Sequence, residues 1–357
     1  MSSPEGLTAP RRVHGGPDPM ELRALGLTAG DVIDFSVNVN PYGPAPSVAA
    51  AARSAQLARY PDPAAAEVRA ALAARWRWDP AGVLFAHGAT EILWDLARHL
   101  VRRGERVLVV EPAFSEFSAA LHASGGRAIG WRAAEGHDTP FDPAAVGEAL
   151  VRSEARACCL ATPSSPLGLA VPHDDVERLA RAHPGVLFIL DESFLALSDD
   201  HAGAHRALPA NVARLRSLTK EHAIPGLRVG YLLAEPSLVS DLEAARPAWS
   251  TSAPAQAAAL AAVAEERFVE ESRRRLAADR EALRDGLARL GLAPWPSVAP
   301  YLAFKVGDAV ALRRRLLARR LLVRDCASFG LPGVIRVAAR PASERAALLA
   351  ALAEELR

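Results

Sequence analysis

The stretch VLFILDES, residues 186–193, decides the fold class, because five apolar residues run without interruption into Asp191. Similar apolar runs recur along the chain, several of them separated by helical patterns, at 83–87, 106–114, 156–163, 214–220 and 226–234. Near-continuous apolar strands alternating with helices are typical of a mostly parallel sheet that is covered on both faces. The sequence therefore predicts an α/β fold with three layers, α/β/α.

The last third of the chain follows a different pattern. An alanine-rich helical region covers residues 254–292, and YLAFKV, LLVRDC and GVIRVAAR beyond it are expected to be short strands. Helices are expected at 308–319 and 342–356. These elements predict a smaller α+β domain beside a larger one, with boundaries at 46–265 for the large domain and at 1–45 and 266–357 for the small one.

Composition limits the classes of function. The chain has 357 residues, 50% of them hydrophobic, and 42 basic residues nearly balance 41 acidic ones. No basic run is interleaved with aromatic residues, so we expect no nucleic-acid partner. No apolar stretch reaches the roughly 18 residues that cross a bilayer, and the opening MSSPEGLTAPRR lacks the apolar core of a signal peptide. Cys158, Cys159 and Cys326 match neither a disulfide framework nor a metal-ligand spacing, so we expect no metal and a reducing cytoplasm.

Lysine is scarce in this chain. It occurs only at Lys220 and Lys305, so 42 − 2 = 40 of the basic residues are arginine. A codon bias toward arginine explains most of this. Under such a bias, a lysine that remains is a candidate for chemistry that a guanidinium cannot perform, such as forming a Schiff base.

Polar residues follow several of the predicted strands at their carboxyl ends, where open α/β sheets bind ligands. Gly88-Ala89-Thr90 opens a helix after the run at 83–87, where exposed N–H groups and the helix dipole favour an anion. A plain helix cap at Thr90 is the alternative. The chain has no GxGxxG fingerprint and no phosphate-binding GK[ST] loop, which argues against a nucleotide-binding protein.

Two further strand ends carry charge. Asp191 is either a solvated strand end or the partner of a ring nitrogen that must stay protonated. Lys220 is normally read as a solvated side chain, but Arg228 follows it by eight residues. Arg228 and Ser217 could both bind a phosphate, and the cationic neighbour would lower the pKa of the lysine amine.

The chain also resembles a known family. The segment RSLTKEHAIPGLRVGYLL looks like the lysine segment of fold-type-I pyridoxal-phosphate enzymes of the class I/II aminotransferases. Within that group the chain is similar to threonine-phosphate decarboxylases of cobalamin biosynthesis and to histidinol-phosphate aminotransferases. The resemblance covers nearly the whole chain and rests on the order of HGG (14–16), DFSVNVNPYGP (34–44), RYPDP (59–63), GATE (88–91), EPAFSEF (111–117), SPLG (165–168), DESF (191–194), SLTK (217–220), PGLRVGY (225–231) and VRDCASFGLPGVIRVAAR (323–340).

The resemblance implies a role for each matching residue. Lys220 would carry pyridoxal 5′-phosphate as a Schiff base and then move the proton, and Asp191 would pair with the ring nitrogen. Phe114 would stack on the ring, although an ordinary core aromatic is the alternative. The residues implied to bind the coenzyme are Gly88, Ala89, Thr90, Phe114, Ser165, Asp191, Ser217, Lys220 and Arg228, with Tyr60 reaching the neighbouring subunit of a homodimer.

The substrate residues are implied in the same way. Arg336 would bind the substrate carboxylate, and His14, Asn38 and Arg324 are candidates for a substrate phosphate. Two positions depart from the family pattern, because Ser165 replaces the usual asparagine and Phe194 the usual tyrosine. Both usual residues hydrogen-bond the phenolic oxygen of the coenzyme, and phenylalanine cannot.

The motifs HGG, DFSVNVNPYGP and VRDCASFGLPGVIRVAAR favour a decarboxylase. Under this expectation O-phospho-L-threonine loses CO2 to give (R)-1-amino-2-propanol phosphate in cobalamin biosynthesis. The alternative is an aminotransferase of the histidinol-phosphate type. A non-catalytic binding protein on the same fold is a third hypothesis, disfavoured by the joint presence of Lys220, Asp191 and Arg228.

Overall fold

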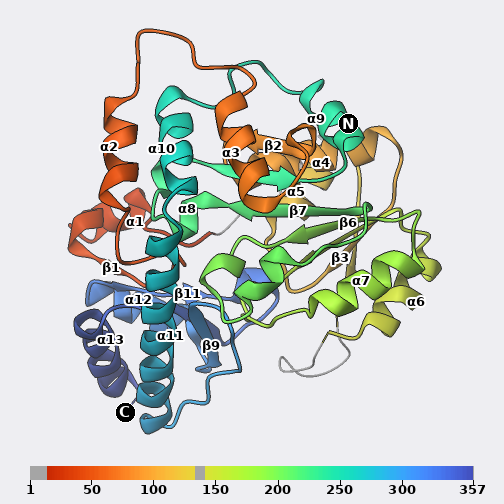
Figure 1. The fold of residues 1–357 in the computed structure, drawn as a ribbon. Helices are drawn as coiled ribbons and strands as arrows, with labels where there is room; N and C mark the ends of the chain where they lie inside the picture. Colours follow the sequence, from red (N-terminus) through yellow and green to blue (C-terminus); the bar gives the residue numbers. More distant parts are fainter. Residues whose placement is uncertain (1–13, 133–140, 357) are drawn as a thin grey trace, which may run out of the picture.

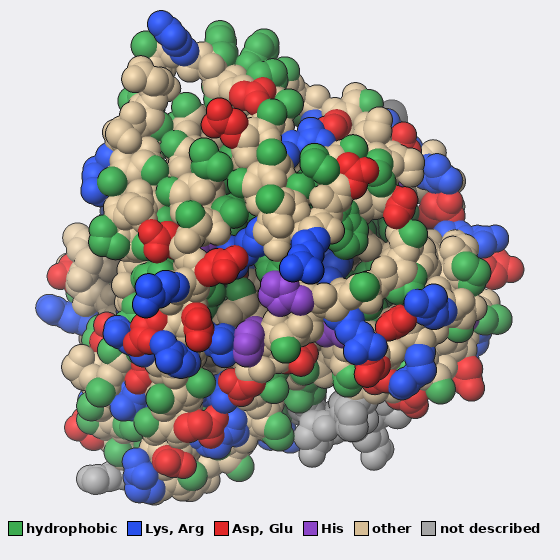
Figure 2. Space-filling model, in the orientation of Figure 1, with side chains coloured by type: hydrophobic (Ala, Val, Ile, Leu, Met, Phe, Trp, Pro, Cys, Tyr) green, Lys and Arg blue, Asp and Glu red, His purple; other side chains and the backbone are tan. Residues whose placement is uncertain are grey.

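The computed structural model describes residues 14–132 and 141–356. The opening MSSPEGLTAPRR, residues 1–12, lies outside the described residues. Within the described part, no helix is both long enough and apolar enough to cross a membrane. Acidic and basic side chains are interspersed on the face that Figure 2 shows, in keeping with the balanced charge.

A seven-stranded sheet forms the centre of the larger part of the molecule (Figure 1). Its strand order is β2-β8-β7-β6-β5-β3-β4, and all neighbouring pairs are parallel except the two that involve β8. The α/β class and the mostly parallel sheet are therefore confirmed. The strands are β2 (Val83–Ala86), β3 (Val107–Val110), β4 (Ala128–Trp131), β5 (Ala157–Ala161), β6 (Leu187–Asp191), β7 (Val212–Ser217) and β8 (Gly230–Leu233).

Helices bury both faces of this sheet. On β6, Ile189 packs into a core with one set of helices, while Phe188 and Leu190 pack into a core on the opposite face. Burial on both sides explains why the strand is an unbroken apolar run. The first face is covered by α4 (Ala89–Arg102), α5 (Glu116–Ala123) and α9 (Pro236–Glu243), and the opposite face by α6 (Pro143–Ser153) and α7 (His173–Ala182), with α2 (Pro46–Ser54), α3 (Ala66–Trp76) and α10 (Ala253–Val263) over β2 and β8.

The expected helical region 254–292 is two helices. α10 ends at Val263, and α11 (Glu266–Arg289) begins three residues later and runs toward the C-terminal part of the molecule. There, β9 (Tyr301–Lys305), β11 (Arg324–Asp325) and β12 (Val334–Ala338) form an antiparallel sheet, whose edge residue Lys305 is exposed. The other elements of this part are α12 (Ala309–Ala318), β10 (Leu321–Leu322) and α13 (Ala342–Glu355).

The N-terminal segment lies against this C-terminal part. It contains α1 (Pro19–Ala24) and β1 (Ile33–Asp34), and β1 pairs in parallel with β10. Phe35 is fully buried in the same core as Leu302 and Phe304 of β9. The division of the chain into two domains at residues 45 and 265 stays a prediction.

Candidate active site

A cavity of about 510 Å³ lies at the carboxyl ends of β5, β6 and β7, where it meets the N-terminal segment and the C-terminal sheet. Most of the site residues predicted from the sequence line this one cavity, although they are spread over more than 300 positions of the chain. They are His14, Asn38, Ala89, Thr90, Phe114, Ser165, Asp191, Ser217, Lys220, Arg228, Arg324 and Arg336. Gly88 and Tyr60 are not among the lining residues.

Asp191 and Lys220 both line the cavity, and the Asp191 charge acts on the lysine amine. Asp191 is the last residue of β6, and its Oδ1 accepts a hydrogen bond of 2.9 Å from the backbone N–H of Ser193. Lys220 lies on the short helix α8 (Leu218–Glu221), with Nζ 3.4 Å from Ser217 Oγ and 4.9 Å from the centre of the Phe194 ring. Burial lowers the pKa of the Lys220 amine, the Asp191 charge opposes that effect, and Arg228 adds to it.

The backbone around Lys220 is held by a residue that the sequence did not nominate. Asn40 donates from its backbone N–H to Lys220 O at 2.9 Å, and its Nδ2 donates to Glu221 O at 2.9 Å. Asn40 is the second asparagine of VNVNPYGP, so the turn sequence that marked the N-terminal segment also fixes the lysine loop.

The N-terminus of α4 and Arg228 form an anion-binding end of the cavity. Gly88 precedes this helix with φ of 83°, and Arg228 has a left-handed φ of 56°. A Cβ on Gly88 would lie 2.8 Å from Arg228 Nη2, and a Cβ on Gly230 would lie 2.4 Å from Ala89 N. Glycine at both positions therefore allows the guanidinium and the free N–H groups of the helix to approach the same space.

Two hydroxyl groups complete this end. Ser217 Oγ and Thr219 Oγ1 lie 2.6 Å apart, and both residues line the cavity. Thr219 lies within the motif SLTK, but no role was predicted for it from the sequence. Together these donors fit a phosphate group.

Arg336 lies at another side of the cavity, on β12, and is 6% exposed. Its Nη1 donates to Ser165 Oγ at 2.9 Å and its Nη2 to Ser36 O at 2.6 Å, while Nε has no hydrogen-bond partner among the described residues. The guanidinium lies 5.3 Å from the centre of the Tyr301 ring. Burial lowers the pKa of Arg336.

Two other nominated residues lie near this arginine. Arg324, on β11, donates from Nη2 to Ser328 Oγ at 2.6 Å and lies 5.1 Å from the centre of the Phe329 ring. Asn38 is 6% exposed, and neither its Oδ1 nor its Nδ2 has a partner among the described residues. A buried amide without partners, in the wall of a cavity, is available to a ligand.

His14 lies at the edge of the cavity beside Phe114, with 5.4 Å between the ring centres. Its Nε2 lies 2.8 Å from Glu116 Oε1, and Glu116 Oε2 accepts a hydrogen bond of 2.9 Å from Trp94 Nε1. Glu116 is buried and lines the cavity, yet no sequence pattern singled it out, because an acidic residue in the first turn of a helix is ordinary.

Tyr60 is 81% exposed on the segment between α2 and α3, and its ring lies 4.8 Å from the ring centre of Trp249. It does not reach the cavity of its own chain.

The residues present fit pyridoxal 5′-phosphate. The cavity offers an amine with a lowered pKa, a carboxylate on the neighbouring strand, an aromatic ring, and a phosphate cradle in which glycine is required at two positions. Fold and site together define a pyridoxal-phosphate-dependent enzyme of fold type I.

Comparison with known proteins agrees. Residues 30–354 match the model of the family "Aminotransferase class I and II", and the chain belongs to this family. It is 33% identical to histidinol-phosphate aminotransferase 1 of Thiobacillus denitrificans, over 96% of this chain and 90% of that protein. It is also 33% identical to the histidinol-phosphate aminotransferase of Symbiobacterium thermophilum, over 92% of each chain.

Solved structures show the same similarity. The histidinol-phosphate aminotransferase of Sinorhizobium meliloti, in complex with pyridoxal 5′-phosphate, superposes with a TM-score of 0.84 at 28% identity, over 96% of this chain and 95% of that one. The L-threonine-O-3-phosphate decarboxylase of Porphyromonas gingivalis has a TM-score of 0.79 at 24% identity, over 90% of this chain and 98% of that one, and shows the shared fold alone. The predicted family, enzyme class and coenzyme are thus confirmed.

The expectation of a decarboxylase is wrong. Curated relatives that match nearly the whole chain at about the same identity are histidinol-phosphate aminotransferases. The motifs that favoured decarboxylation form the N-terminal segment and part of the cavity wall, and they did not separate the two reaction types. The assignments to a lyase and to cobalamin biosynthesis are not confirmed.

Proposed function

We propose that this enzyme is an aminotransferase of the histidinol-phosphate type, which moves an amino group between a phosphate-bearing amine and a 2-oxo acid. The observation that carries the proposal is the 33% identity, over 96% of the chain, to a histidinol-phosphate aminotransferase. The cavity supports it, because Arg324, Arg336 and the unpartnered amide of Asn38 add anion-binding capacity beyond the cradle at Arg228.

The coenzyme, when bound, supplies an electron sink that stabilises negative charge at the substrate α-carbon and carries the amino group between the two substrates. Lys220 holds it covalently through Nζ, and the lowered pKa leaves the freed amine able to take the α-proton and return it. Asp191 would pair with the ring nitrogen and favour its protonated form. Ala89, Thr90, Ser217 and Arg228 bind the coenzyme phosphate beside Gly88.

The remaining residues act on the substrates. Arg336 binds the carboxylate of the oxo acid with its guanidinium fork, oriented by Ser165 and by the carbonyl of Ser36. Arg324 and Asn38 bind the phosphate of the amine substrate. Phe114 covers the coenzyme ring, and His14 closes the cavity beside it, which excludes water from the reacting centre.

We further propose a homodimer in the cytoplasm. An exposed tyrosine that packs on Trp249, itself 50% exposed, is the kind of aromatic surface that a second copy would cover, and Tyr60 then reaches the phosphate of the partner's coenzyme. The three cysteines are free and buried, which suits a reducing compartment.

The test is a half-reaction. Protein loaded with pyridoxal phosphate is mixed with histidinol phosphate, without any oxo acid, and its absorbance is recorded. We expect stoichiometric conversion of the coenzyme to its amino form, no release of CO2, and recovery of the original spectrum when 2-oxoglutarate is added. An unchanged spectrum with histidinol phosphate, in a protein that does react with another amino acid, would refute the proposed substrate.

A further inference from the structure

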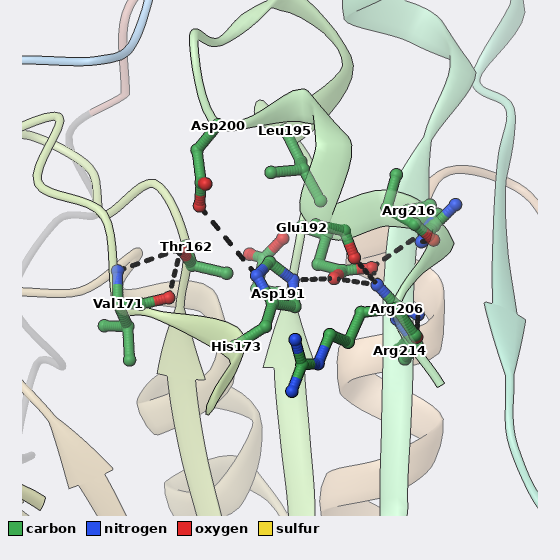
Figure 3. Close-up of polar contacts among 12 residues, drawn as sticks. Thr162, Val171, His173, Asp191, Glu192, Leu195, Asp200, Arg206, Arg214 and Arg216 are labelled. Carbon is green, nitrogen blue, oxygen red and sulfur yellow. Dashed lines mark hydrogen bonds and ion pairs between the residues drawn. The ribbon is translucent and has the colours of Figure 1, made fainter. Parts of the chain in front are cut away.

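A buried cluster of charged residues lies next to Asp191, at the end of β6 (Figure 3). Asp191 lines the cavity, whereas the next residue, Glu192, is in contact with Arg214, Arg216 and His173, and none of these four lines it. The two adjacent carboxylates at the end of β6 thus have different environments, because Asp191 lines the cavity and Glu192 lies in the buried cluster.

The contacts to Glu192 use both of its carboxylate oxygens. Arg214 donates from Nη2 to Oε1 at 2.6 Å and from Nε to Oε2 at 2.9 Å, and Arg216 donates from Nε to Oε2 at 2.8 Å. His173 Nε2 lies 2.8 Å from Oε1. The Glu192 side chain is 0% exposed, and the three partners are each below a tenth exposed, so water screens this cluster little.

The two arginines also bind a surface segment to the back of the sheet. Arg214 donates to Arg206 O at 2.7 Å and to Gly203 O at 2.8 Å, and Arg216 donates to Ala204 O at 2.7 Å. These carbonyls belong to the 3-10 helix His201–His205 and the residue after it. The cluster therefore joins β6, β7, the first turn of α7 and this helix at the level of Asp191.

The two arginines keep Glu192 ionised. Burial alone would raise the pKa of Glu192, but Arg216 and Arg214 outweigh it and hold this pKa well below its usual range. Two guanidinium groups thus face one ionised carboxylate. Asp200 approaches His173 Nδ1 at 3.8 Å, and burial raises the pKa of Asp200. Arg216 also interacts with the Tyr231 hydroxyl and lies 3.9 Å from the centre of the Trp76 ring.

On the cavity side, the charged groups that act on Lys220 are Asp191, Arg228, Glu221 and Arg336. The buried thiol of Cys159 also faces Asp191. Arg216 is separated from Lys220 by only three residues, and its strand neighbour Ser217 lines the cavity. Without the Glu192 carboxylate, the positive charges of Arg214 and Arg216 would lie uncompensated in a dry region close to the coenzyme pocket, where a charge acts over a longer range than in water.

We infer that Glu192, held by Arg214, Arg216 and His173, is a positioning residue for the coenzyme pocket. It fixes the end of β6 that presents Asp191, and its carboxylate offsets part of the positive charge of the two arginines. The inference rests on the proposed roles of Asp191 and Lys220. It does not depend on which amine is the substrate.

The test follows the absorbance of the coenzyme-loaded protein as a function of pH, without substrate. Glu192→Gln removes a negative charge, so the lysine-bound coenzyme should hold its proton less well, and the midpoint of the transition should fall by about one pH unit. Arg216→Gln removes a positive charge and should raise the midpoint by a similar amount. Arg214→Lys keeps the charge but loses the two-point contact, and should leave the midpoint within a few tenths of a unit of the wild type.

The opposite signs separate this role from a purely structural one. Loss of packing alone would move the Glu192→Gln and Arg216→Gln midpoints in the same direction or not at all, and that result would overturn the inference. Glu177→Gln is the matched control, because Glu177 is a carboxylate of α7 that pairs with Arg181 and Arg206 and has no contact with Glu192. If Glu192→Gln fails to retain the coenzyme, Arg216→Gln decides, and a lowered or unchanged midpoint there refutes the inference.

Discussion

Arg336 Nη1 lies 2.9 Å from Ser165 Oγ, so the residue that departs from the family's asparagine is bound to the arginine that we propose to hold the substrate carboxylate. A serine hydroxyl is shorter than an asparagine amide, and here it contacts a guanidinium from another sheet. Ser165 thereby links the loop after β5 to β12.

Replacing Arg336 should weaken binding of the oxo acid more than it slows the chemical step. Arg336→Lys keeps the charge but loses the fork that contacts Ser165, Ser36 and the carboxylate together. A charge-assisted hydrogen bond contributes about 1.5–3 kcal/mol, so we expect KM for 2-oxoglutarate to rise about 10- to 100-fold. Steady-state kinetics measure this, with Arg340→Lys as the control, because Arg340 pairs with Glu344 outside the cavity. An unchanged KM would contradict the assignment.

Gly230 should tolerate no side chain without loss of coenzyme binding. Its Cβ would lie 2.4 Å from Ala89 N, so Gly230→Ala must displace the first turn of α4, where we propose that the phosphate binds. We expect the dissociation constant for pyridoxal phosphate to rise at least about tenfold, which corresponds to about 1.4 kcal/mol. Gly226→Ala is the matched control, since a Cβ there meets nothing within 4 Å. Equal affinities in the two variants, measured by fluorescence titration, would argue against this cradle.

The coenzyme-free protein should be destabilised by Lys220 at neutral pH. Burial lowers the pKa of this amine below the value of 10.5 that it has when exposed, so the unfolded chain binds more protons than the folded one in the interval between the two pKa values. Stability therefore rises with pH in that interval, toward 10.5. Lys220→Met should be more stable than wild type at pH 7, and the difference should shrink as the pH rises. Urea unfolding of both proteins tests this, and a difference independent of pH would contradict it.

Shared active sites predict complementation between two inactive variants. Lys220→Ala lacks the essential amine, and Tyr60→Ala lacks the residue that we propose to serve the partner's site. In a hybrid dimer, one site has both an intact lysine and an intact tyrosine from the partner, so activity should appear when the two proteins are mixed under conditions of subunit exchange. Each variant incubated alone is the control. No gain on mixing, despite hybrid dimers detected by native mass spectrometry, would exclude Tyr60 from the partner's site.

Much of the fold could be predicted because burial on two faces leaves a strong pattern, as in β6. The pattern could not give strand direction, since β8 is as apolar as its neighbours but runs antiparallel to β7 and β2. β4 was missed because Ala128–Trp131 is a partly exposed edge strand with a central glycine, which weakens the apolar signal.

The site was predictable where chemistry demands one residue type. A Schiff base needs an amine, which singled out Lys220. Asp191 was noted at a strand end, and Arg228 because it follows Lys220 by eight residues. Asn40, Thr219 and Glu116 were missed as site residues, because their importance depends on which atoms they meet in space. The choice between decarboxylation and transamination failed for a related reason, since a sequence does not show how a substrate is oriented in the cavity.

The exposure of Lys305 at the edge of β9 has a practical consequence. It and Lys220 are the only lysines in the chain, and Lys220 faces an internal cavity. Amine-reactive reagents applied to coenzyme-loaded protein should therefore modify Lys305 before Lys220. A fluorophore or a surface linker can thus be attached at one defined lysine, on the opposite end of the C-terminal sheet's edge strand from Tyr301, without engineering a cysteine.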